Sequence, residues 1–471
     1  MNNEDIMLDE GESDDDEEDD EDDINDTRLQ PSDALIVVAK TEEDYASLEI
    51  NIFDTNSSNL YVHHDIPLPS YPLCLSLGNV VGGRQVESSS STTTVGNYVA
   101  VGSFEPSIEI WNLDVMNALE PTLVLGGVDH RDDDWMNTMM IGGGGKKSNN
   151  NNKKKKNKGG GGGLRNGSHT DAIMSLSWNT VHTQVLASGS ADHTVKLWDV
   201  TSQGANNGYI EPSVTLSHHT DKVCSLAWHV SEGTLLATGS YDRTVCLVDA
   251  RSAAAVSSSN SKSKSNVKST KLVADCEALV WDTNNAQYLT VASEDGTVSC
   301  YDVRKFDKGP VWSMVAHEYG VSDVCYNSQV SGMLVTCSID KTVKLWDTRN
   351  VTPGSTPRLC GQKEMNVGKL YTASFYPSSQ WLLACGGSGN ELCVWDMEGE
   401  DAIQKRFSAE TSAAALADDG MSKDEEKEEP DFEKIMAMED DKDDTTKSQK
   451  SKSKKNKGKK GKGKSKAHKR K

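Results

Sequence analysis

The chain has 471 residues, of which 35% are hydrophobic, and its net charge is −23. So little apolar content at that length excludes a chain that is packed throughout, and we expect a sizeable part to be disordered. No stretch approaches the roughly 20 apolar residues of a transmembrane helix. The acidic N-terminus has no pattern of a signal or transit peptide, so we expect an intracellular protein with no membrane partner.

Ten cysteines are scattered along the chain, and none forms a CxxC pair. Several lie inside apolar runs, among them Cys224, Cys246, Cys325 and Cys337, as is typical of small buried residues in a reducing compartment. No group of cysteines and histidines has the spacing of zinc ligands, so we expect neither a zinc site nor any other cofactor.

The first element in chain order is an acidic head, predicted to be disordered over residues 1–30. Residues 1–26 hold sixteen acidic side chains and no basic one. Such a run is either a solvating tail or a binding segment for basic partners such as histones or ribosomal proteins, and the sequence favours neither. Ser13, which precedes a run of acidic residues, is a candidate phosphorylation site where a phosphate would add about 2 negative charges.

The next predicted element is a repeat domain, residues 31–400, in which five segments align. Their last residues are Asp199, Asp249, Asp302, Asp347 and Asp396. In each copy an aromatic residue lies twenty positions before the residue that precedes this Asp. The pairs are Trp178/Trp198, Trp228/Val248, Trp281/Tyr301, Tyr326/Trp346 and Phe375/Trp395. Each copy contains three short strand-like runs, which must stack on neighbouring copies to bury a face, and this is typical of a β-propeller.

These segments resemble WD repeats. In that family a histidine, a hydroxyl residue, an aspartate and a tryptophan form a hydrogen-bonded tetrad, which gives each buried polar group a partner. The first copy matches this pattern with His169, Ser188, Asp192 and Trp198. The fourth matches it with His317, Thr336, Asp340 and Trp346. The second copy has His219, Thr238 and Asp242, with Val248 in place of tryptophan.

The third and fifth copies depart further from the tetrad. The third keeps Asp295 with Tyr301, and the fifth has Gly389 where aspartate is expected. We therefore expect these copies, like the second, to depend more on packing than on the polar network.

The predicted fold class is all-β, a seven-bladed WD-repeat β-propeller with disordered charged termini. The predicted blades span about residues 35–66, 71–125, 169–210, 219–251, 272–304, 317–349 and 368–397. The strand around Leu35–Ala39 is expected to pair with the final blade, which would close the ring and remove its open edges. Three low-complexity insertions are expected to be disordered loops, residues 84–96, 142–163 and 252–270.

After the propeller we predict an acidic disordered linker, residues 401–446, and a basic disordered tail, residues 447–471. The tail holds thirteen Lys and one Arg without an acidic residue. It is either a solvated tail or, as we favour, a segment that binds RNA through counterion release and directs nuclear import. The residues to which we assign this role are Lys452, Lys454, Lys455, Lys457, Lys459, Lys460, Lys462, Lys464, Lys466, Lys469, Arg470 and Lys471.

The sequence contains no GxSxG, P-loop, HExxH or dinucleotide-binding motif. The repeated histidines and aspartates already have a structural explanation, so we expect a non-catalytic binding module without a small-molecule substrate.

An arginine lies two residues after the closing aspartate in three copies, as in Asp249–Arg251, Asp302–Arg304 and Asp347–Arg349. Around Asp347 and Arg349 the sequence resembles the box by which WD-repeat receptors dock onto the adaptor of a cullin ubiquitin ligase. Three copies suit an architectural role better than one docking site, so we favour an arginine that forms a salt bridge with a neighbouring blade.

Several segments also resemble the periodic tryptophan protein family of WD-repeat proteins, over roughly residues 30–397. They are EDYASLEINIFD, NLYVHHDIPLPSYPLCLSLGN, HTDAIMSLSWN and SHHTDKVCSLAWH. The resemblance implies a nuclear, mainly nucleolar scaffold in ribosome biogenesis, with roles in large-subunit precursor assembly and rRNA processing and a link to ribosomal-gene transcription. The implied partners are ribosome assembly factors and pre-ribosomal RNA. The alternatives are a substrate receptor of a cullin ubiquitin ligase and a propeller that binds histones or chromatin.

Overall fold

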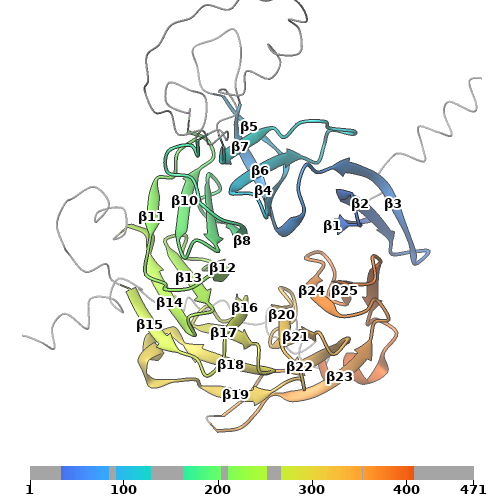
Figure 1. The fold of residues 1–471 in the computed structure, drawn as a ribbon. Helices are drawn as coiled ribbons and strands as arrows, with labels where there is room; N and C mark the ends of the chain where they lie inside the picture. The colour runs from blue at the N-terminus through green and yellow to red at the C-terminus, as the bar shows by residue number, and fades with distance from the viewer. Residues whose placement is uncertain are drawn as a thin grey trace, which may run out of the picture. The chain divides into compact units, whose positions relative to one another are not determined.

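The computed structural model describes residues 33–83, 92–128, 163–202, 210–251, 267–352 and 354–407. Their strands form seven antiparallel sheets, which are arranged around a ring as blades (Figure 1). This confirms the predicted seven-bladed β-propeller. The disorder predicted for the head, the 142–163 insertion and the tail concerns residues that lie outside the described ones, apart from Gly163.

The blades follow the chain in order. Blade 1 has three strands: β1 (Asp33–Thr41), β2 (Ala46–Asp54) and β3 (Asn59–Pro67). Blade 2 has four: β4 (Pro72–Gly83), β5 (Thr92–Ser103), β6 (Ser107–Asn112) and β7 (Leu123–Gly126).

Blades 3 to 7 contain the five aligned copies, in order. Blade 3 consists of β8 (Ile173–Trp178), β9 (Val185–Ser190), β10 (Val195–Asp199) and β11 (Val214–Leu216). Blade 4 consists of β12 (Val223–Trp228), β13 (Leu235–Ser240), β14 (Thr244–Asp249) and β15 (Val267–Lys271). Blade 5 consists of β16 (Cys276–Trp281), β17 (Tyr288–Ser293), β18 (Thr297–Asp302) and β19 (Trp312–Val315), with the 3-10 helix η2 (Val303–Lys308) between the last two. Blade 6 consists of β20 (Val321–Tyr326), β21 (Met333–Ser338), β22 (Thr342–Asp347) and β23 (Arg358–Glu364). Blade 7 consists of β24 (Leu370–Phe375), β25 (Leu382–Gly387) and β26 (Leu392–Asp396).

The twenty-residue interval has a direct structural cause. In blade 3, Trp178 on β8 is paired with Leu186 on β9, which is paired with Trp198 on β10. All three residues therefore lie in one row across the sheet, and all are buried. The other copies repeat this row with a central leucine, at Leu236, Leu289, Leu334 and Leu383. The interval is fixed because the strands are paired in the same register in every copy and the turns between them keep the same length.

In blades 4 and 5 the first member of the row, a tryptophan, also links neighbouring blades. Trp228 Nε1 donates to the carbonyl oxygen of Ser177 at 3.0 Å, and Trp281 Nε1 donates to that of Ala227 at 3.1 Å. Each indole therefore buries its ring in one blade and bonds to the first strand of the blade before it, so the blades are held both by apolar contact and by hydrogen bonds.

Two of the predicted insertions are wrong in part. Residues 92–96, expected in the loop 84–96, belong to β5, where Thr92 is paired with Gly83 of β4. Residues 267–270, expected in the loop 252–270, belong to β15, where Val267 is paired with Val248. In both places the β-branched residues continue a ladder that a neighbouring strand has begun, and this outweighs their polar surroundings in the sequence.

The predicted closure of the ring is also wrong. The strand around Leu35–Ala39 is part of β1, which is paired with β2 of its own blade from Asp33↔Asp54 to Thr41↔Ala46. Blades 1 and 7 both have three described strands, and they meet through an apolar cluster. Its buried members are Ala34, Phe53 and Leu382. Side-chain packing thus closes the ring where strand exchange was expected.

The propeller extends past its predicted end. Residues 401–407, assigned above to a disordered linker, are helical. Ile403 and Phe407 of this segment are buried, at 1% and 2% exposure, in the cluster that also contains Trp395 and Met365. The alternation of apolar Ile403 and Phe407 at i and i+4 places both on one face of a helix, which explains why a short polar segment packs here. None of the helical segments among the described residues is long and apolar enough to cross a membrane.

Candidate functional site

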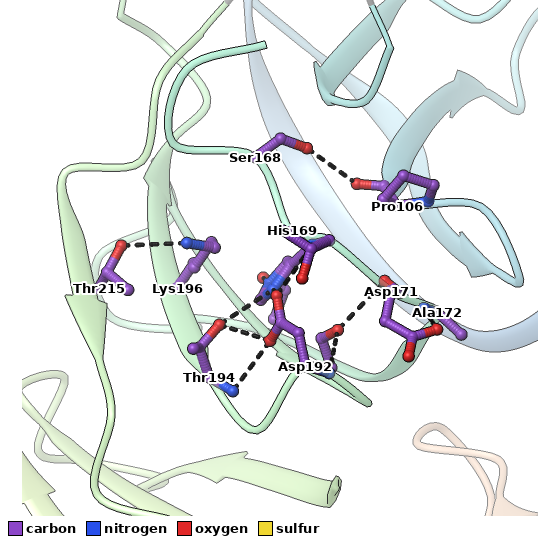
Figure 2. Close-up of polar contacts among 12 residues, drawn as sticks. Pro106, Ser168, His169, Asp171, Ala172, Asp192, Thr194, Lys196 and Thr215 are labelled. Atoms are coloured by element: carbon purple, nitrogen blue, oxygen red, sulfur yellow. Dashed lines mark hydrogen bonds and ion pairs between the residues drawn. The ribbon is translucent and has the colours of Figure 1, made fainter. Parts of the chain in front are cut away.

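The polar network of blade 3 connects the loop before β8 to the turn between β9 and β10 (Figure 2). His169 Nδ1 lies 2.9 Å from Asp192 Oδ2, and His169 Nε2 lies 2.8 Å from Ser188 Oγ. Trp198 Nε1 donates to the same hydroxyl oxygen at 2.8 Å. Because the carboxylate only accepts, Nδ1 holds the proton and Nε2 accepts from Ser188. The hydrogen bonds therefore run in one direction, from Trp198 through Ser188 and His169 to Asp192.

Burial determines the charges in this network. It lowers the pKa of His169, and the hydrogen bond with Asp192 reverses that effect only in part, so the imidazole is neutral at pH 7. Burial acts to raise the pKa of Asp192, but the hydrogen bonds from His169, the Thr194 hydroxyl and the Thr170 amide outweigh it and hold this pKa well below its ordinary value. A neutral donor and an ionised acceptor keep the network in one protonation state over the physiological range.

Blade 6 repeats this arrangement. His317 lies 2.8 Å from both Asp340 Oδ2 and Thr336 Oγ1, and Trp346 Nε1 donates to Thr336 Oγ1 at 3.0 Å. In both blades a lysine is paired with the hydroxyl residue across the strands, Lys196 in blade 3 and Lys344 in blade 6.

Blade 4 completes the same network with a histidine in place of the tryptophan. His219 contacts Asp242 Oδ2 at 3.0 Å and Thr238 Oγ1 at 2.8 Å, as in the other two networks. Val248 cannot donate a hydrogen bond, and His218 Nε2 instead lies 2.9 Å from Thr238 Oγ1. The sequence reasoning missed His218, although the doublet His218–His219, where the other copies have a single histidine, was a visible signal.

Two further indoles, in blades 2 and 7, donate to acidic side chains. Trp395 Nε1 donates to Glu400 Oε1 at 2.9 Å, and Trp111 Nε1 donates to Glu109 Oε2 at 3.1 Å. In blades 5 and 7 the position of Ser188 is taken by Val291 and Cys385, both buried. Where the hydroxyl is absent the histidine is absent too, and the aspartate remains only in blade 5, where Asp295 bonds within its own turn.

The network histidines and three buried cysteines are not prepared for nucleophilic or acid–base chemistry. Each network histidine is buried and bonded to an aspartate and a hydroxyl. Burial raises the pKa of the thiols of Cys74, Cys300 and Cys385 to about 12, so these cysteines are protonated and unreactive at neutral pH.

The three Asp–Arg pairs differ from our expectation of bridges between blades. Arg251, Arg304 and Arg349 each pair with the aspartate two residues earlier in the same blade. The aspartate Oδ1 also accepts the arginine backbone N–H, at 2.9–3.0 Å. The carboxylate thus closes the turn that follows the third strand, and the side chain folds back because its own backbone is already held there.

Arg349 is the most buried of the three. Its side chain is 12% exposed, against 52% for Arg251 and 39% for Arg304. Residues 401–407 cover it: Arg406 Nε donates to Asp347 Oδ2 at 2.6 Å, and the Arg349 guanidinium lies 4.7 Å from the centre of the Phe407 ring. The surface that would have to dock onto a ubiquitin-ligase adaptor is therefore occupied by this chain's own segment.

Three exposed aromatic residues gather where blades 1 and 2 meet. Tyr45, Tyr71 and Phe104 are 44%, 40% and 62% exposed. Tyr71 Oη donates to the Glu43 carbonyl oxygen at 2.6 Å, and the Phe104 amide donates to the Tyr71 carbonyl oxygen at 3.4 Å. We call these three residues the aromatic patch. Its turn at Phe104, between β5 and β6, corresponds in position to the turn that holds Asp192 in blade 3.

Several residues singled out in the sequence lie outside the described part of the chain. They are Ser13 of the acidic head and all twelve basic residues assigned to the tail, Lys452 to Lys471.

The comparisons with known proteins agree with this architecture. The family model "WD domain, G-beta repeat" matches residues 164–199, 210–249 and 308–347, which are the three copies that contain a His–Asp pair. Periodic tryptophan protein 1 of Saccharomyces cerevisiae is 32% identical over 87% of this chain and 72% of its own length. A periodic tryptophan protein 1 homologue of Drosophila melanogaster is 31% identical over 81% of this chain and 71% of its own length. An uncharacterised WD repeat-containing protein of Schizosaccharomyces pombe is 35% identical over 85% of this chain and 67% of its own length. The chain belongs to the periodic tryptophan protein 1 family of WD-repeat proteins.

Proposed function

We propose that this protein is an assembly scaffold of ribosome biogenesis, which acts in the nucleus and mainly in the nucleolus. In this proposal the propeller binds ribosome assembly factors, and the basic tail binds pre-ribosomal RNA during large-subunit precursor assembly and rRNA processing. Support comes from the family to which the chain belongs. The observation that carries the proposal is the aromatic patch, which offers a surface for a protein partner.

The aromatic patch has the properties of a protein-binding site. Aromatic residues supply much of the binding energy in protein interfaces, because they bury a large area at a small cost in conformational entropy. Tyr71 is held in place by its bond to Glu43, and the Tyr45 hydroxyl by a 2.7 Å bond to Asp65. The two tyrosine rings are therefore exposed but fixed, so a partner would not have to order them.

The basic tail suits a different kind of contact. Its lysines alternate with Gly and Ser and have no aromatic neighbours, so the tail would bind phosphates without reading the base sequence. The two contacts would have different roles. The propeller would select the protein partners, and the tail would add affinity for the RNA to which these partners are bound.

The proposal is tested by purification of the tagged full-length protein, followed by identification of the bound proteins and RNA. We expect ribosome assembly factors and large-subunit precursor RNA. The variant Tyr71→Ala/Phe104→Ala should lose protein partners by about tenfold or more, because two anchors are removed. Leu119→Ala, at a residue that is 84% exposed away from the patch, is the matched control and should retain them. Recovery of no precursor RNA and no assembly factor with the unmodified protein would refute the proposal.

The proposed RNA-binding role of the basic tail is tested by removing its positive charge. Replacing the lysines of residues 447–471 with glutamine should reduce RNA crosslinking and flatten its dependence on salt, whereas replacement with arginine should preserve both. If the glutamine variant recovers as much RNA as the unmodified protein, the tail has no RNA role, and the aromatic-patch experiment still decides the scaffold.

A further inference from the structure

Blade 4 brings together three side chains that can bind a metal ion. Cys246 Sγ and one ring nitrogen each of His218 and His219 all lie within 4.8 Å of one another. Cys246 and His219 are buried, and His218 is largely so. We propose that His218, His219 and Cys246 form a site for a single Zn²⁺ ion, with Thr238 beside it.

The first argument is that the ligands converge. The Nε2 atoms of both imidazoles point at one atom, Thr238 Oγ1, at 2.9 and 2.8 Å. Cys246 is paired with Thr238 on the adjacent strand, so its thiol faces the same point from the other side. A tetrahedral zinc ion has nitrogen ligands at about 2.0–2.1 Å and sulfur at about 2.3 Å. A contraction of about 1 Å would bring the three atoms to these distances.

One candidate ligand, His219, is already oriented by a hydrogen bond from its other ring nitrogen. His219 Nδ1 donates to Asp242 Oδ2 at 3.0 Å, which leaves Nε2 as a lone pair aimed into the site. A carboxylate that holds the second nitrogen of a histidine is the usual outer support of a zinc ligand.

The comparison with blades 3 and 6 sets this site apart. There the residues paired with the network hydroxyl are Lys196 and Lys344, whose ammonium groups would repel a metal ion. Blade 4 has Cys246 at this position, and it has His218 where the others have Ser168 and Ala316. Among the three blades that contain the network, two ligands therefore appear in the one where the lysine and the tryptophan are missing. The ligands come from separate strands and loops, which is why their spacing in the sequence gave no signal.

The test is a Zn²⁺ titration of the full-length, reduced protein against a competing chromophoric chelator. We expect one tight site per chain. His218→Ala and Cys246→Ser should each weaken it by about a hundredfold or more. Cys300→Ser, at a buried thiol on the corresponding strand of blade 5, is the matched control and should retain the site. Zn²⁺ should also raise the melting temperature of the unmodified protein and of Cys300→Ser, but not of Cys246→Ser.

A second measurement does not depend on the variants folding. Co²⁺ bound to the unmodified protein should show a thiolate charge-transfer band at one ion per chain, and added Zn²⁺ should remove it. Absence of that band, or Zn²⁺ binding that is equal in the unmodified protein and in both ligand variants, overturns the proposal. In that case His218 serves only to bond Thr238 in place of the missing indole.

Discussion

Blades 5 and 6 are neighbours with the same aromatic–leucine–aromatic row. The residues beside that row are polar in blade 6 and mainly apolar in blade 5. In blade 6, His317, Thr336 and Asp340 form a buried polar network that ends on Trp346. In blade 5 the position of Thr336 is Val291, and Tyr301 closes the row. Asp295 of blade 5 is exposed and bonds only within its own turn, to Thr297. The comparison teaches that row and network are separable: the row defines the blade, and the network is one way to complete it.

The largest effect is expected from removing Trp346, which belongs to both the row and the network of blade 6. Trp346→Ala should lower the free energy of unfolding by about 3–5 kcal/mol, since it empties a large buried volume and takes the indole donor from Thr336. Urea denaturation measures the loss. Val315→Ala, at a residue of blade 5 that is 72% exposed, should change stability by less than about 0.5 kcal/mol. Equal losses of stability in the two variants would mean that the row does not stabilise the blade.

The row could also be predicted from the sequence. A side chain in every copy stands at a fixed separation from another, because strand pairing allows no slip, and that regularity is visible without a structure. The hydrogen-bonded tetrads of blades 3 and 6 could likewise be assigned, since their residues recur at fixed offsets.

What the sequence could not show depends on contacts between distant segments. The bond from His218 to Thr238 needs the loop before β12 to fold back over β13. The cover of Asp347 by Arg406 joins residues 59 positions apart. The closure of the ring by Ala34, Phe53 and Leu382 joins the two ends of the propeller. None of these has a periodic signal, and in the case of ring closure a general rule about open edges led to the wrong strand.

The second prediction separates the network from the turn. Asp340→Ala should cost about 2–4 kcal/mol, because it removes the cap of the turn and leaves the buried His317 Nδ1–H without an acceptor. Asp295→Ala in blade 5 removes only the bonds to Thr297 and should cost about 1 kcal/mol. Both are measured as urea midpoints. Equal losses at the two positions would show that the aspartate acts through its turn alone.

The third prediction concerns a half-buried carboxyl group of blade 5, that of Glu277. Burial, with added repulsion from Glu294 and Asp275, raises the pKa of Glu277 to about 7. The folded chain therefore keeps a proton that the unfolded chain releases near pH 4.5, so this group's contribution to stability is lost as the pH rises from about 4.5 to about 7.

Glu277→Gln should remove that loss. At pH 8 the variant should be more stable than the unmodified protein by about 1–2 kcal/mol, a range that allows for the partial exposure of the side chain. At pH 4 the two should be alike. Glu318→Gln, at an exposed carboxyl group, is the control. Urea midpoints as a function of pH test the sign, and a variant that gains stability only in acid would contradict it.

The smallest effect is expected in the turns themselves. Blade 5 has Gly296 in the left-handed region, with φ 82°, where blade 6 has Lys341, with φ 74°. Only glycine adopts this conformation without a steric cost from Cβ. The Lys341 side chain is exposed, so Lys341→Gly should remove the strain with little loss of contact and raise the free energy of unfolding by about 0.5–1 kcal/mol. Lys341→Ala keeps Cβ and should bring no such gain. If both variants are equally stable, the difference between the two turns has no energetic meaning, and blades 5 and 6 differ only in the network behind their rows.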